Sequence, residues 1–514
     1  MTPAYKRKLF YLLFSTSVLR LLLASFTEFG NDEVYYWTYA QHLQWNYFDH
    51  PPMVALWIRF FTGDLALEQY EVFVRLGSIV SCAISTVLIF RIATRLHSEG
   101  AGWIAALLYN ASIYASIIAG VFILPDSPQM VFWCSCLYLL LRIDGDSRRW
   151  KWWLLFGICA GLCIMSKVHG AFLWIGFGLY ILFTKREYLR LPQLYVAAFI
   201  TALIISPIFL WNIQNNFITY RYHSERVTVH GFALNYTGFA RELFGEIFYN
   251  NPLLVFIIAT ALISWRKIRA GRVATLKLYN FIALPMIGVL IMLSLFRDTL
   301  PHWSGPAYVT LIPIAAIYLS KNGKGLQKAR WALGIMVCIA IAGLCLINFY
   351  PGTMGDKSPK ELGYGDFTLD MYGWREAGEE FQKLYKKEQA SGVMAPQAPV
   401  ICYRWFPAAN EDYYFCREVE APVIGLGTVH DLHHYVWLNS YRLHETNLQQ
   451  AYCIVPSHES YDVRAQYSSY YKKVDSITTI NNYRGGKMCR SFSVWRLQGW
   501  KNAPVPVPQH LQVK

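Results

Sequence analysis

Charged residues are scarce in this sequence of 514 residues. Asp, Glu, Lys and Arg together make up 16% of the chain, whereas they make up about a quarter of an ordinary soluble domain. Hydrophobic residues make up 54%, aromatic residues make up 16%, and the mean hydropathy is +0.25. This composition excludes an ordinary soluble domain and predicts a polytopic membrane protein.

The sequence also lacks the signals of several other protein classes. The formal net charge is +14, but the basic residues lie in short connections between apolar runs, which does not favour a nucleic-acid-binding surface. The first apolar run, at 9–29, is too long for the hydrophobic region of a cleavable signal peptide and has no small-residue cleavage site. No paired CxxC motifs indicate a structural zinc site. No internal repeat or low-complexity tract is found.

Apolar segments long enough to cross about 30 Å of hydrocarbon recur over the part of the chain before residue 351. They fall at 9–29, 72–93, 101–121, 128–142, 152–167, 169–184, 191–211, 245–265, 276–296, 305–320 and 331–350. We therefore predict about eleven transmembrane α-helices, in a polytopic α-helical fold.

Basic residues mark every second connection between these segments. Lys6, Arg7 and Lys8 precede the first segment, and each even-numbered segment is followed by Lys or Arg. Because cytoplasmic loops carry an excess of these residues, the basic connections are predicted to be cytoplasmic. The odd-numbered exits carry acidic residues and histidines and are predicted to face the opposite side, as is the chain beyond the last helix.

The pattern predicts two domains that differ in composition. Residues 1–350 form a transmembrane domain with a juxtamembrane loop at 30–70 on the outer face, and residues 351–514 form a small extracytoplasmic α/β domain. In the second domain, the stretches at 398–402, 451–455 and 491–497 have the alternating pattern of strands. The stretch at 374–387 has the pattern of an amphipathic helix.

Four of the eleven cysteines lie in this predicted outer domain. An even number of cysteines in an oxidising compartment predicts two disulfides. Of the three pairings, we expect Cys402–Cys416 and Cys453–Cys489, because each pair could link neighbouring strands. The other cysteines lie in apolar helices, where they are expected to act as small buried hydrophobic residues.

The stretch from Asn31 to Pro52 places two acidic clusters directly after a predicted membrane crossing. These are Asp32-Glu33 and Asp49-His50, with aromatic residues around both. Ionisable groups held at a membrane boundary are costly and usually mark a functional site. The alternative is a solvated loop anchored by interfacial Tyr and Trp.

Further polar side chains lie in the other predicted outer loops, namely Asp126, Lys167, His169, Arg221, His223, Arg226 and His302. Carboxylates beside histidines suit general base catalysis or metal binding, and Lys or Arg at a lipid–water boundary suits a phosphate group. For Lys167 alone, the alternative is an interfacial lysine whose ammonium group reaches toward water. The set predicts a reaction that combines a base with phosphate binding.

The first outer loop, with Asp32-Glu33-Val34-Tyr35-Tyr36 and then YFDHPP at 47–52, resembles the GT-C class of integral-membrane glycosyltransferases. Within that class it is similar to the bacterial branch of the protein O-mannosyltransferase family, which includes lipid A aminoarabinose transferase and related lipopolysaccharide-modifying enzymes. The resemblance covers roughly residues 9–320. Further matching motifs are LPDSP at 124–128, SK at 166–167, SP…WN at 206–212 and HWSGPAY at 302–308.

The resemblance implies a sugar donor carried on a polyprenyl phosphate and an acceptor hydroxyl or phosphate on the outer face. Asp32 falls on the acidic residue that the family is proposed to use to deprotonate or orient the acceptor, and Asp126 falls on a second acidic position. A carboxylate shielded from bulk water can have a raised pKa and act as a base near neutral pH. Lys167 falls on a basic position suited to the donor phosphate, where Arg226 or His302 could assist it.

Several of these positions keep two interpretations. Glu33 is expected either to take part in catalysis or to hold the loop, and His302 either to bind the donor or to cap the tenth helix. Asp49-His50 stands where the aminoarabinose transferases have an acidic residue followed by lysine, which leaves the sugar open. Asp49 and a histidine such as His223 could share a divalent metal, or His223 could be a hydrogen-bonded loop histidine. No other cofactor and no nucleotide-binding loop are expected.

We therefore predict a hexosyl or pentosyl transferase that moves a sugar from a polyprenyl phosphate to lipid A or the lipopolysaccharide core by an inverting displacement. It is expected to be a monomer in the bacterial inner membrane, among membrane lipids, with its C-terminal domain in the periplasm. A protein or another surface glycan is the alternative acceptor. A transporter or flippase for lipid-linked sugars is disfavoured because helix-interior charges are few and no inverted repeat is found. A non-catalytic scaffold would leave Asp32, Asp49 and Asp126 unexplained.

Overall fold

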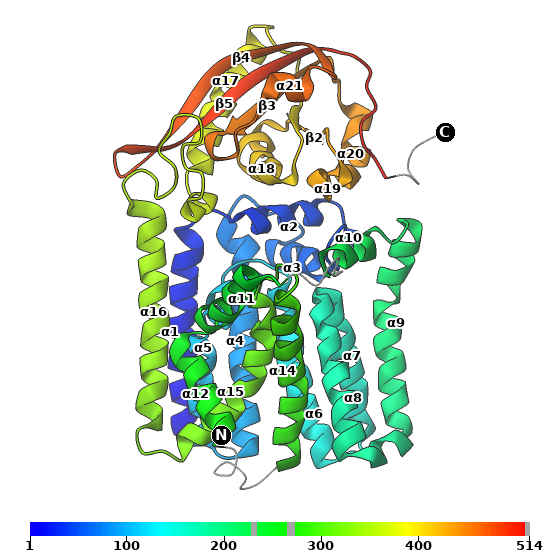
Figure 1. Cartoon of the computed structure of the whole chain (residues 1–514), viewed down its shortest axis with the longest axis vertical. Helices are drawn as coiled ribbons and strands as arrows, with labels where there is room; N and C mark the ends of the chain where they lie inside the picture. The colour runs from blue at the N-terminus through cyan, green and yellow to red at the C-terminus, as the bar shows by residue number, and fades with distance from the viewer. Residues whose placement is uncertain (228–233, 265–272, 509–514) are drawn as a thin grey trace. The chain divides into compact units, whose positions relative to one another are not determined.

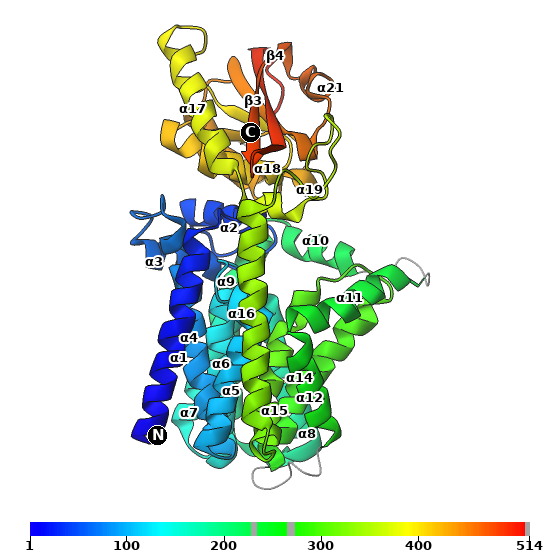
Figure 2. The same cartoon turned by 90° about the vertical axis from the view of Figure 1, so that its left-hand side faces the viewer.

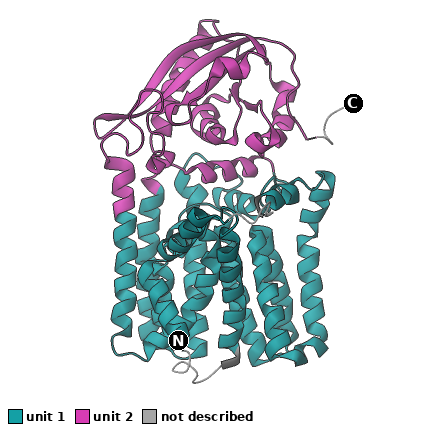
Figure 3. Ribbon diagram, viewed as in Figure 1, with its two compact units in different colours: residues 1–24, 43–341 teal, residues 25–42, 342–514 magenta. Residues whose placement is uncertain are grey.

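The computed structural model describes residues 1–227, 234–264 and 273–508. In this part of the chain α-helices predominate and one five-stranded sheet is present (Figure 1). The chain divides into two compact units: residues 1–24 with 43–341 form the first, and residues 25–42 with 342–514 form the second (Figure 3). The chain therefore leaves the first unit after residue 24, returns at residue 43, and leaves it again after residue 341.

The first unit is built from helices, the longest of which run side by side (Figures 1 and 2). They are α1 (Pro3–Ser25), α3 (Met53–Thr62), α4 (Glu71–Leu96), α5 (Glu99–Ala111), α6 (Asp126–Gly145), α7 (Trp150–Ser166), α8 (Ala171–Thr184), α9 (Pro192–Gln214), α10 (Ile218–Val227), α11 (Tyr236–Tyr249), α12 (Pro252–Ile263), α14 (Val273–Ser294), α15 (Gly305–Ser320) and α16 (Gly325–Phe349). These positions follow the predicted apolar segments closely, because apolar runs of this length can satisfy their backbone groups in lipid only as helices.

Among the described helices, five are long and apolar enough to cross a membrane. They are α1, α4, α9, α16 and Thr275–Ser294 of α14, and α11 with α12 would add a sixth if the bent pair forms one span. The chain is thus a multi-pass α-helical membrane protein, as predicted. The count of eleven crossings stays a prediction.

Two predicted segments are broken rather than continuous. The segment at 101–121 ends its helix at Ala111 and continues as the wider turn η1 (Tyr114–Ile118). The segment at 245–265 contains a bend of 96° between α11 and α12. At this bend Asn251 has a left-handed φ of 71°, its side chain accepts a hydrogen bond from the Leu253 backbone, and Pro252 has no N–H to continue the preceding helix.

Small residues allow the helices of the first unit to approach closely. A Cβ atom built on Gly157 of α7 would lie 2.6 Å from the backbone oxygen of Ala197 on α9, so no larger residue fits there. Small residues at such crossings are a general feature of membrane helices, whose association relies on close packing rather than on exclusion of water. Gly157 therefore fixes the distance between α7 and α9.

The prediction of a loop at 30–70 was wrong. Helix α2 (Asn31–Gln41) in the second unit and helix α3 in the first unit both lie within it. At the start of helix α2 the Glu33 carboxylate accepts a hydrogen bond from the Gly30 backbone at 3.0 Å, which is one half of a capping box, since glycine has no side chain to supply the other half. The aromatic residues that suggested an interfacial loop are instead the buried face of α2.

The second unit contains the sheet, whose strand order is β2-β1-β3-β5-β4. The strands are β1 (Val400–Cys402), β2 (Val423–Gly425), β3 (Gln450–Pro456), β4 (Tyr471–Arg484) and β5 (Lys487–Trp500). Strand β1 pairs in parallel with β2 and β3, whereas β3, β5 and β4 pair antiparallel. The amphipathic helix α17 (Trp374–Ala390) and strands β1, β3 and β5 confirm the predicted elements. Strand β2 has three residues and β4 is rich in polar residues, so neither shows a clear strand pattern.

The expected disulfides are not formed, because all four cysteines of the second unit are free thiols. Cys453 on β3 faces Trp495 on β5, and Cys489 lies six positions earlier on the same strand, about 20 Å away at 3.3 Å per residue. Cys402 donates instead to the backbone oxygen of Ile424, and Cys416 is buried. The prediction failed because sequence spacing does not give strand register.

Candidate active site

A buried ion pair lies at the ends of two neighbouring helices of the first unit. Asp126 is the first residue of α6, and Lys167 directly follows the last residue of α7. The Lys167 Nζ atom lies 3.0 Å from Oδ1 and 2.8 Å from Oδ2 of Asp126, and the Tyr114 hydroxyl donates to Oδ1 at 2.8 Å. The Lys167 and Asp126 side chains are 6% and 3% exposed. Because both charges are out of water, each depends on the other for compensation.

This arrangement decides what the two residues can do chemically. Asp126 accepts hydrogen bonds from Lys167 and Tyr114, which hold it as an anion and make it a poor group for removing a proton. An ammonium group has three donors, and the contacts with Asp126 occupy at most two of them. The pair therefore suits the binding of an anionic group better than base catalysis.

Two histidines in turns beside this ion pair are held neutral. His302 lies in the turn η4 (Pro301–Ser304), and His169 lies in the turn η2 (Val168–Gly170). Burial, followed by the positive charge of Lys167, lowers the pKa of His302 to about 4 and the pKa of His169 to about 3. At neutral pH each ring offers one donor and one acceptor nitrogen to a ligand.

Asp49 and His50 lie in a segment that is tied to helix α10. Nδ1 of His50 lies 3.4 Å from Oδ2 of Asp49, and Nε2 of His223 on α10 lies 2.8 Å from the backbone oxygen of Asp49. His50 also acts electrostatically on His302, which places it near the ion pair. The contact of His223 fits a hydrogen-bonded loop histidine. Within the described ranges, no three His, Cys, Asp or Glu side chains are grouped closely enough to hold a metal ion.

Asp32 and Glu33 occupy the first turn of α2 in the second unit. Glu33 is buried and caps the helix through the Gly30 backbone, which is the loop-holding interpretation of this residue. Asp32 is exposed, so it does not have the shielding from water that its predicted role as a base assumed. The positive end of the helix dipole lies at this turn and favours carboxylates there.

The structure therefore brings Asp126, Lys167, His302 and His50 together in the first unit. Asp32 and Glu33 belong to the second unit and are described with it. Arg226 lies near the end of α10, and its side chain is outside the described part of the structure.

Two residues, one in each unit, were not found from the sequence. Tyr114 appeared as one aromatic residue in an apolar segment, and only the widened turn η1 shows that its hydroxyl reaches Asp126. Asp370 lies in the turn η5 (Phe367–Met371) of the second unit, where it accepts a hydrogen bond from the Asn31 side chain. No sequence pattern distinguishes Asp370 from other acidic residues in loops, because its surroundings are set by tertiary contacts.

Comparisons with known proteins bear on both the sequence and the fold. The family model for dolichyl-phosphate-mannose-protein mannosyltransferase matches residues 49–211. Lipid A galacturonosyltransferase RgtD of Rhizobium johnstonii is 22% identical over 338 residues, which are 64% of this chain and 67% of that protein. Undecaprenyl phosphate-alpha-4-amino-4-deoxy-L-arabinose arabinosyl transferase of Yersinia enterocolitica is 31% identical over 99 residues, only 18% of either chain.

Solved structures share the fold over almost the whole chain. The crystal structure of ArnT from Cupriavidus metallidurans in the apo state matches with a TM-score of 0.64 at 12% identity, covering 96% of this chain and 98% of that one. The structure of the same protein bound to undecaprenyl phosphate matches with a TM-score of 0.60 at 14% identity, covering 94% and 97%.

The chain therefore shares the fold of ArnT over almost its whole length. Its sequence is similar to those of membrane glycosyltransferases, among them a bacterial lipid A galacturonosyltransferase and an arabinosyl transferase named for undecaprenyl phosphate.

Proposed function

We propose that this glycosyltransferase moves a sugar from a polyprenyl-phosphate carrier to lipid A or the lipopolysaccharide core. The observation that carries the proposal is the buried Asp126–Lys167 pair, which leaves an ammonium donor for a phosphate group. The names of the related proteins support it, since one acts on lipid A and another takes its sugar from undecaprenyl phosphate. The fold relative ArnT binds undecaprenyl phosphate.

In this proposal the reaction is a single displacement with inversion. An oxygen of the acceptor attacks the anomeric carbon of the sugar, and the bond between that carbon and the phosphate oxygen breaks. The proton of the acceptor passes to the Asp32 carboxylate. The bonding electron pair leaves with the polyprenyl phosphate, whose negative charge is stabilised by Lys167.

The remaining residues have supporting roles in the proposal. Asp126 orients Lys167, and Glu33 fixes the turn that carries Asp32. His302, as a neutral donor, and Asp49-His50 bind the substrates, together with Arg226 (a residue whose side chain lies outside the described part). We place the protein in the bacterial inner membrane, as a monomer with the second unit in the periplasm.

Mass spectrometry of lipid A and core oligosaccharide tests the proposal directly. A strain without the gene is complemented with the wild type, with Asp32→Asn, or with Asp64→Asn as the matched control. Asp64 is an exposed acidic residue (its side chain is 76% exposed) that pairs only at the surface with Arg59, so its loss should be harmless. We expect the deletion and Asp32→Asn to lack one sugar mass that the wild type and Asp64→Asn restore.

Other outcomes separate the alternatives. An unchanged lipid profile in the deletion strain would exclude lipid A and the core as acceptors and direct the search to proteins or other surface glycans. Full product from Asp32→Asn would show that Asp32 is not the base. Movement of the lipid-linked sugar across the membrane with no covalent product would indicate a transporter.

A further inference from the structure

Helices α1 and α16, which are both long and apolar enough to cross a membrane, end beside each other in the second unit. In α16, residues 331–349 contain no Asp, Glu, Lys or Arg. At 1.5 Å per residue this stretch is about 28 Å long, close to the thickness of the hydrocarbon core. The side chain of Asn348 donates to the backbone oxygen of Phe26, directly after α1, at 2.9 Å. The lipid–water boundary therefore lies at Phe26 and Phe349.

The turn between strands β4 and β5 lies against the end of α16. A Cβ atom built on Gly485 in this turn would lie 3.0 Å from Cα of Pro351 and 3.3 Å from the backbone oxygen of Phe349. A Cβ atom built on Gly352 would lie 3.3 Å from Cβ of Lys487. These close approaches bring the hairpin turn to the boundary that the end of α16 marks.

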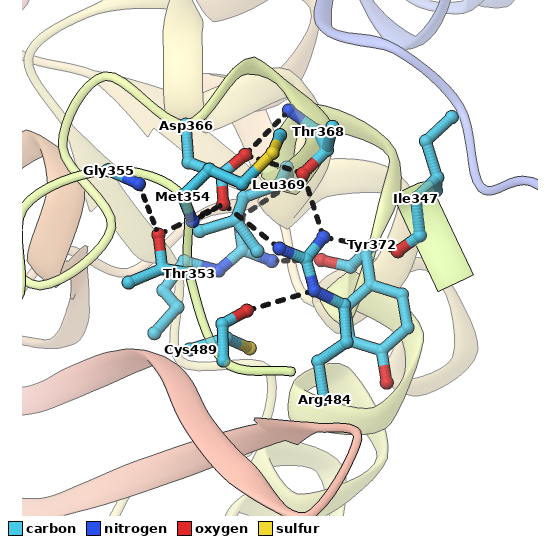
Figure 4. A network of polar contacts seen from close by, with 12 residues as sticks. Ile347, Thr353, Met354, Gly355, Asp366, Thr368, Leu369, Tyr372, Arg484 and Cys489 are labelled. Atoms are coloured by element: carbon cyan, nitrogen blue, oxygen red, sulfur yellow. Dashed lines mark hydrogen bonds and ion pairs between the residues drawn. The ribbon is translucent and has the colours of Figure 1, made fainter. Parts of the chain in front are cut away.

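Arg484 fixes the turn to α16 and to the segment that follows this helix (Figure 4). Its guanidinium group donates to the backbone oxygen of Ile347 in α16 at 3.1 Å and to that of Gly352 at 3.0 Å. Nη2 of Arg484 lies 3.0 Å from Oδ2 of Asp366, and both side chains are fully buried. Arg484 also donates to the Thr368 hydroxyl at 2.7 Å. One arginine thus holds the end of a membrane helix, the hairpin turn and η5 together.

Three exposed phenylalanines lie at this junction. Phe367 stands between the two residues of its segment that bind Arg484, and it is 71% exposed. Phe349 at the end of α16 and Phe26 after α1 are 72% and 61% exposed. Single exposed apolar residues are ordinary on a protein surface, but three beside the ends of two membrane helices match the place where lipid meets water.

The hairpin turn adds both apolar and charged side chains. Tyr483 and Met488 are cross-strand partners on either side of the turn, and both are exposed. Lys487, which precedes Met488, is exposed as well. At a lipid–water boundary a lysine can lay its apolar stem along lipid and place its ammonium group among the phosphates. We call this set the interfacial rim; it consists of Phe26, Phe349, Phe367, Tyr483, Lys487 and Met488.

A lipid surface fits the interfacial rim better than a protein partner does. Side chains at the level where α1 and α16 end meet lipid without any further association. The composition agrees, because aromatic rings and lysines are enriched at the membrane boundary. Among the described residues no carboxylate pairs with Lys487, so its charge is available to a lipid phosphate.

We propose that the interfacial rim binds the second unit to the surface of the membrane that α1 and α16 cross. The phenylalanines and Met488 contact the ends of the acyl chains, while the Tyr483 hydroxyl and the Lys487 ammonium group contact lipid phosphates. Beyond the two helices themselves, these contacts belong to η5 and to the β4–β5 turn. They hold whichever sugar and acceptor the enzyme uses.

Photochemical cross-linking to lipid tests the proposal. Full-length protein is made with a benzophenone-bearing phenylalanine in place of Phe367, Tyr483 or Val393, and is reconstituted into vesicles of phosphatidylethanolamine and phosphatidylglycerol. Val393 is the matched control, because it is an exposed apolar residue of the same unit. It follows α17, whose 17 residues lead about 25 Å away from η5 (Figure 2). After irradiation, peptide mass spectrometry measures the share of each labelled peptide that carries a phospholipid.

We expect several-fold more phospholipid adducts at Phe367 and at Tyr483 than at Val393. Both probes replace exposed side chains, so both proteins should unfold at the wild-type temperature, and either probe tests the proposal if the other protein does not fold. Adducts no more abundant than those at Val393 would overturn the proposal, because the side chains would then face water. Cross-linked dimers in place of lipid adducts would overturn it in favour of a second copy of the chain.

Lys487→Gln tests the charged part of the interfacial rim. With the probe at Phe367, the share of phosphatidylglycerol among the lipid adducts should fall, because anionic lipid gathers beside a cationic side chain. Lys472→Gln is the matched control and should keep the wild-type share, since Lys472 is an exposed lysine at the far end of the same hairpin. No sugar donor or acceptor takes part, so the outcome does not depend on the proposed function. An unchanged share in Lys487→Gln would refute the contact of Lys487 with lipid phosphates.

Discussion

The buried Asp126–Lys167 pair should make Lys167→Met strongly destabilising. Methionine has a similar length but no charge, so Asp126 would remain in the interior with the Tyr114 hydroxyl as its remaining partner among the described residues. Breaking a buried pair by removing one partner costs about 3–5 kcal/mol. We expect the midpoint of thermal unfolding to fall by several degrees.

The double variant Lys167→Met with Asp126→Leu gives the sharper test. Replacing both members of a buried ion pair by apolar residues of similar size is often neutral or stabilising, because no uncompensated charge remains. The double variant should therefore be more stable than Lys167→Met alone. A Tyr114 hydroxyl left without a partner would lower the free energy of unfolding of the double variant by about 1–3 kcal/mol. Adding Tyr114→Phe removes that hydroxyl and should restore this stability.

The assay is thermal unfolding of the purified protein in detergent, followed by the fluorescence of its 18 tryptophans. All three variants should lack transfer activity if Lys167 binds the donor phosphate, so stability and activity separate the structural role from the functional one. The reasoning would be refuted by a Lys167→Met protein as stable as the wild type. A double variant less stable than either single variant would refute it as well.

Two further predictions concern residues in the turns around the candidate site. The pKa of His302 is about 4 in the folded protein and about 6.5 in the unfolded chain, so the unfolded chain binds more protons between these pH values. This difference in pKa contributes about 3 kcal/mol to the free energy of unfolding. The contribution is complete above pH 6.5 and is lost as the pH falls toward 4. His302→Gln should flatten the fall of the unfolding temperature over that range, whereas the exposed-residue control His444→Gln should not, and equal slopes would contradict the pKa argument. Glu33→Ala should remove the capping interaction at Gly30 and destabilise α2 by about 0.5–2 kcal/mol, which faster amide exchange in α2 would report. Glu33→Gln keeps an acceptor oxygen and should exchange more slowly than Glu33→Ala, so equal rates would count against the cap.

The helices could be predicted from the sequence because apolar length dictates them. The bend at Asn251 could not, since it depends on one left-handed residue whose side chain amide donates to the backbone oxygens of Ala111 and Ala332. The pairing of Lys167 with Asp126 was also invisible, because the two residues lie 41 positions apart and only the packing of α6 on α7 brings them together.

The candidate site in the second unit was predicted least well. The motif around Asp32 was evident, but no sequence feature distinguished the two roles of Glu33, and the hydrogen bond with Gly30 favours the structural one. Asp370 could not be found at all, because its position depends on buried arginines from the β4–β5 hairpin, more than a hundred residues further along the chain. The expected Cys453–Cys489 disulfide likewise failed because the register of β3 and β5, which the sequence does not show, places Cys453 opposite Trp495.

The path of the chain between the units sets an order for biosynthesis. Helix α2 is made early, but its aromatic face packs on residues of the second unit that follow about 370–395 residues later. Tyr35 contacts Trp405, Trp37 contacts Tyr413, and Tyr39 contacts His434, with ring centroids 4.9, 5.1 and 4.8 Å apart. At about 5–20 residues per second, the ribosome needs about 20–80 s to supply these partners. The helix that bears Asp32 is thus among the first parts to be synthesised and among the last to be completed, so truncated chains cannot assemble it.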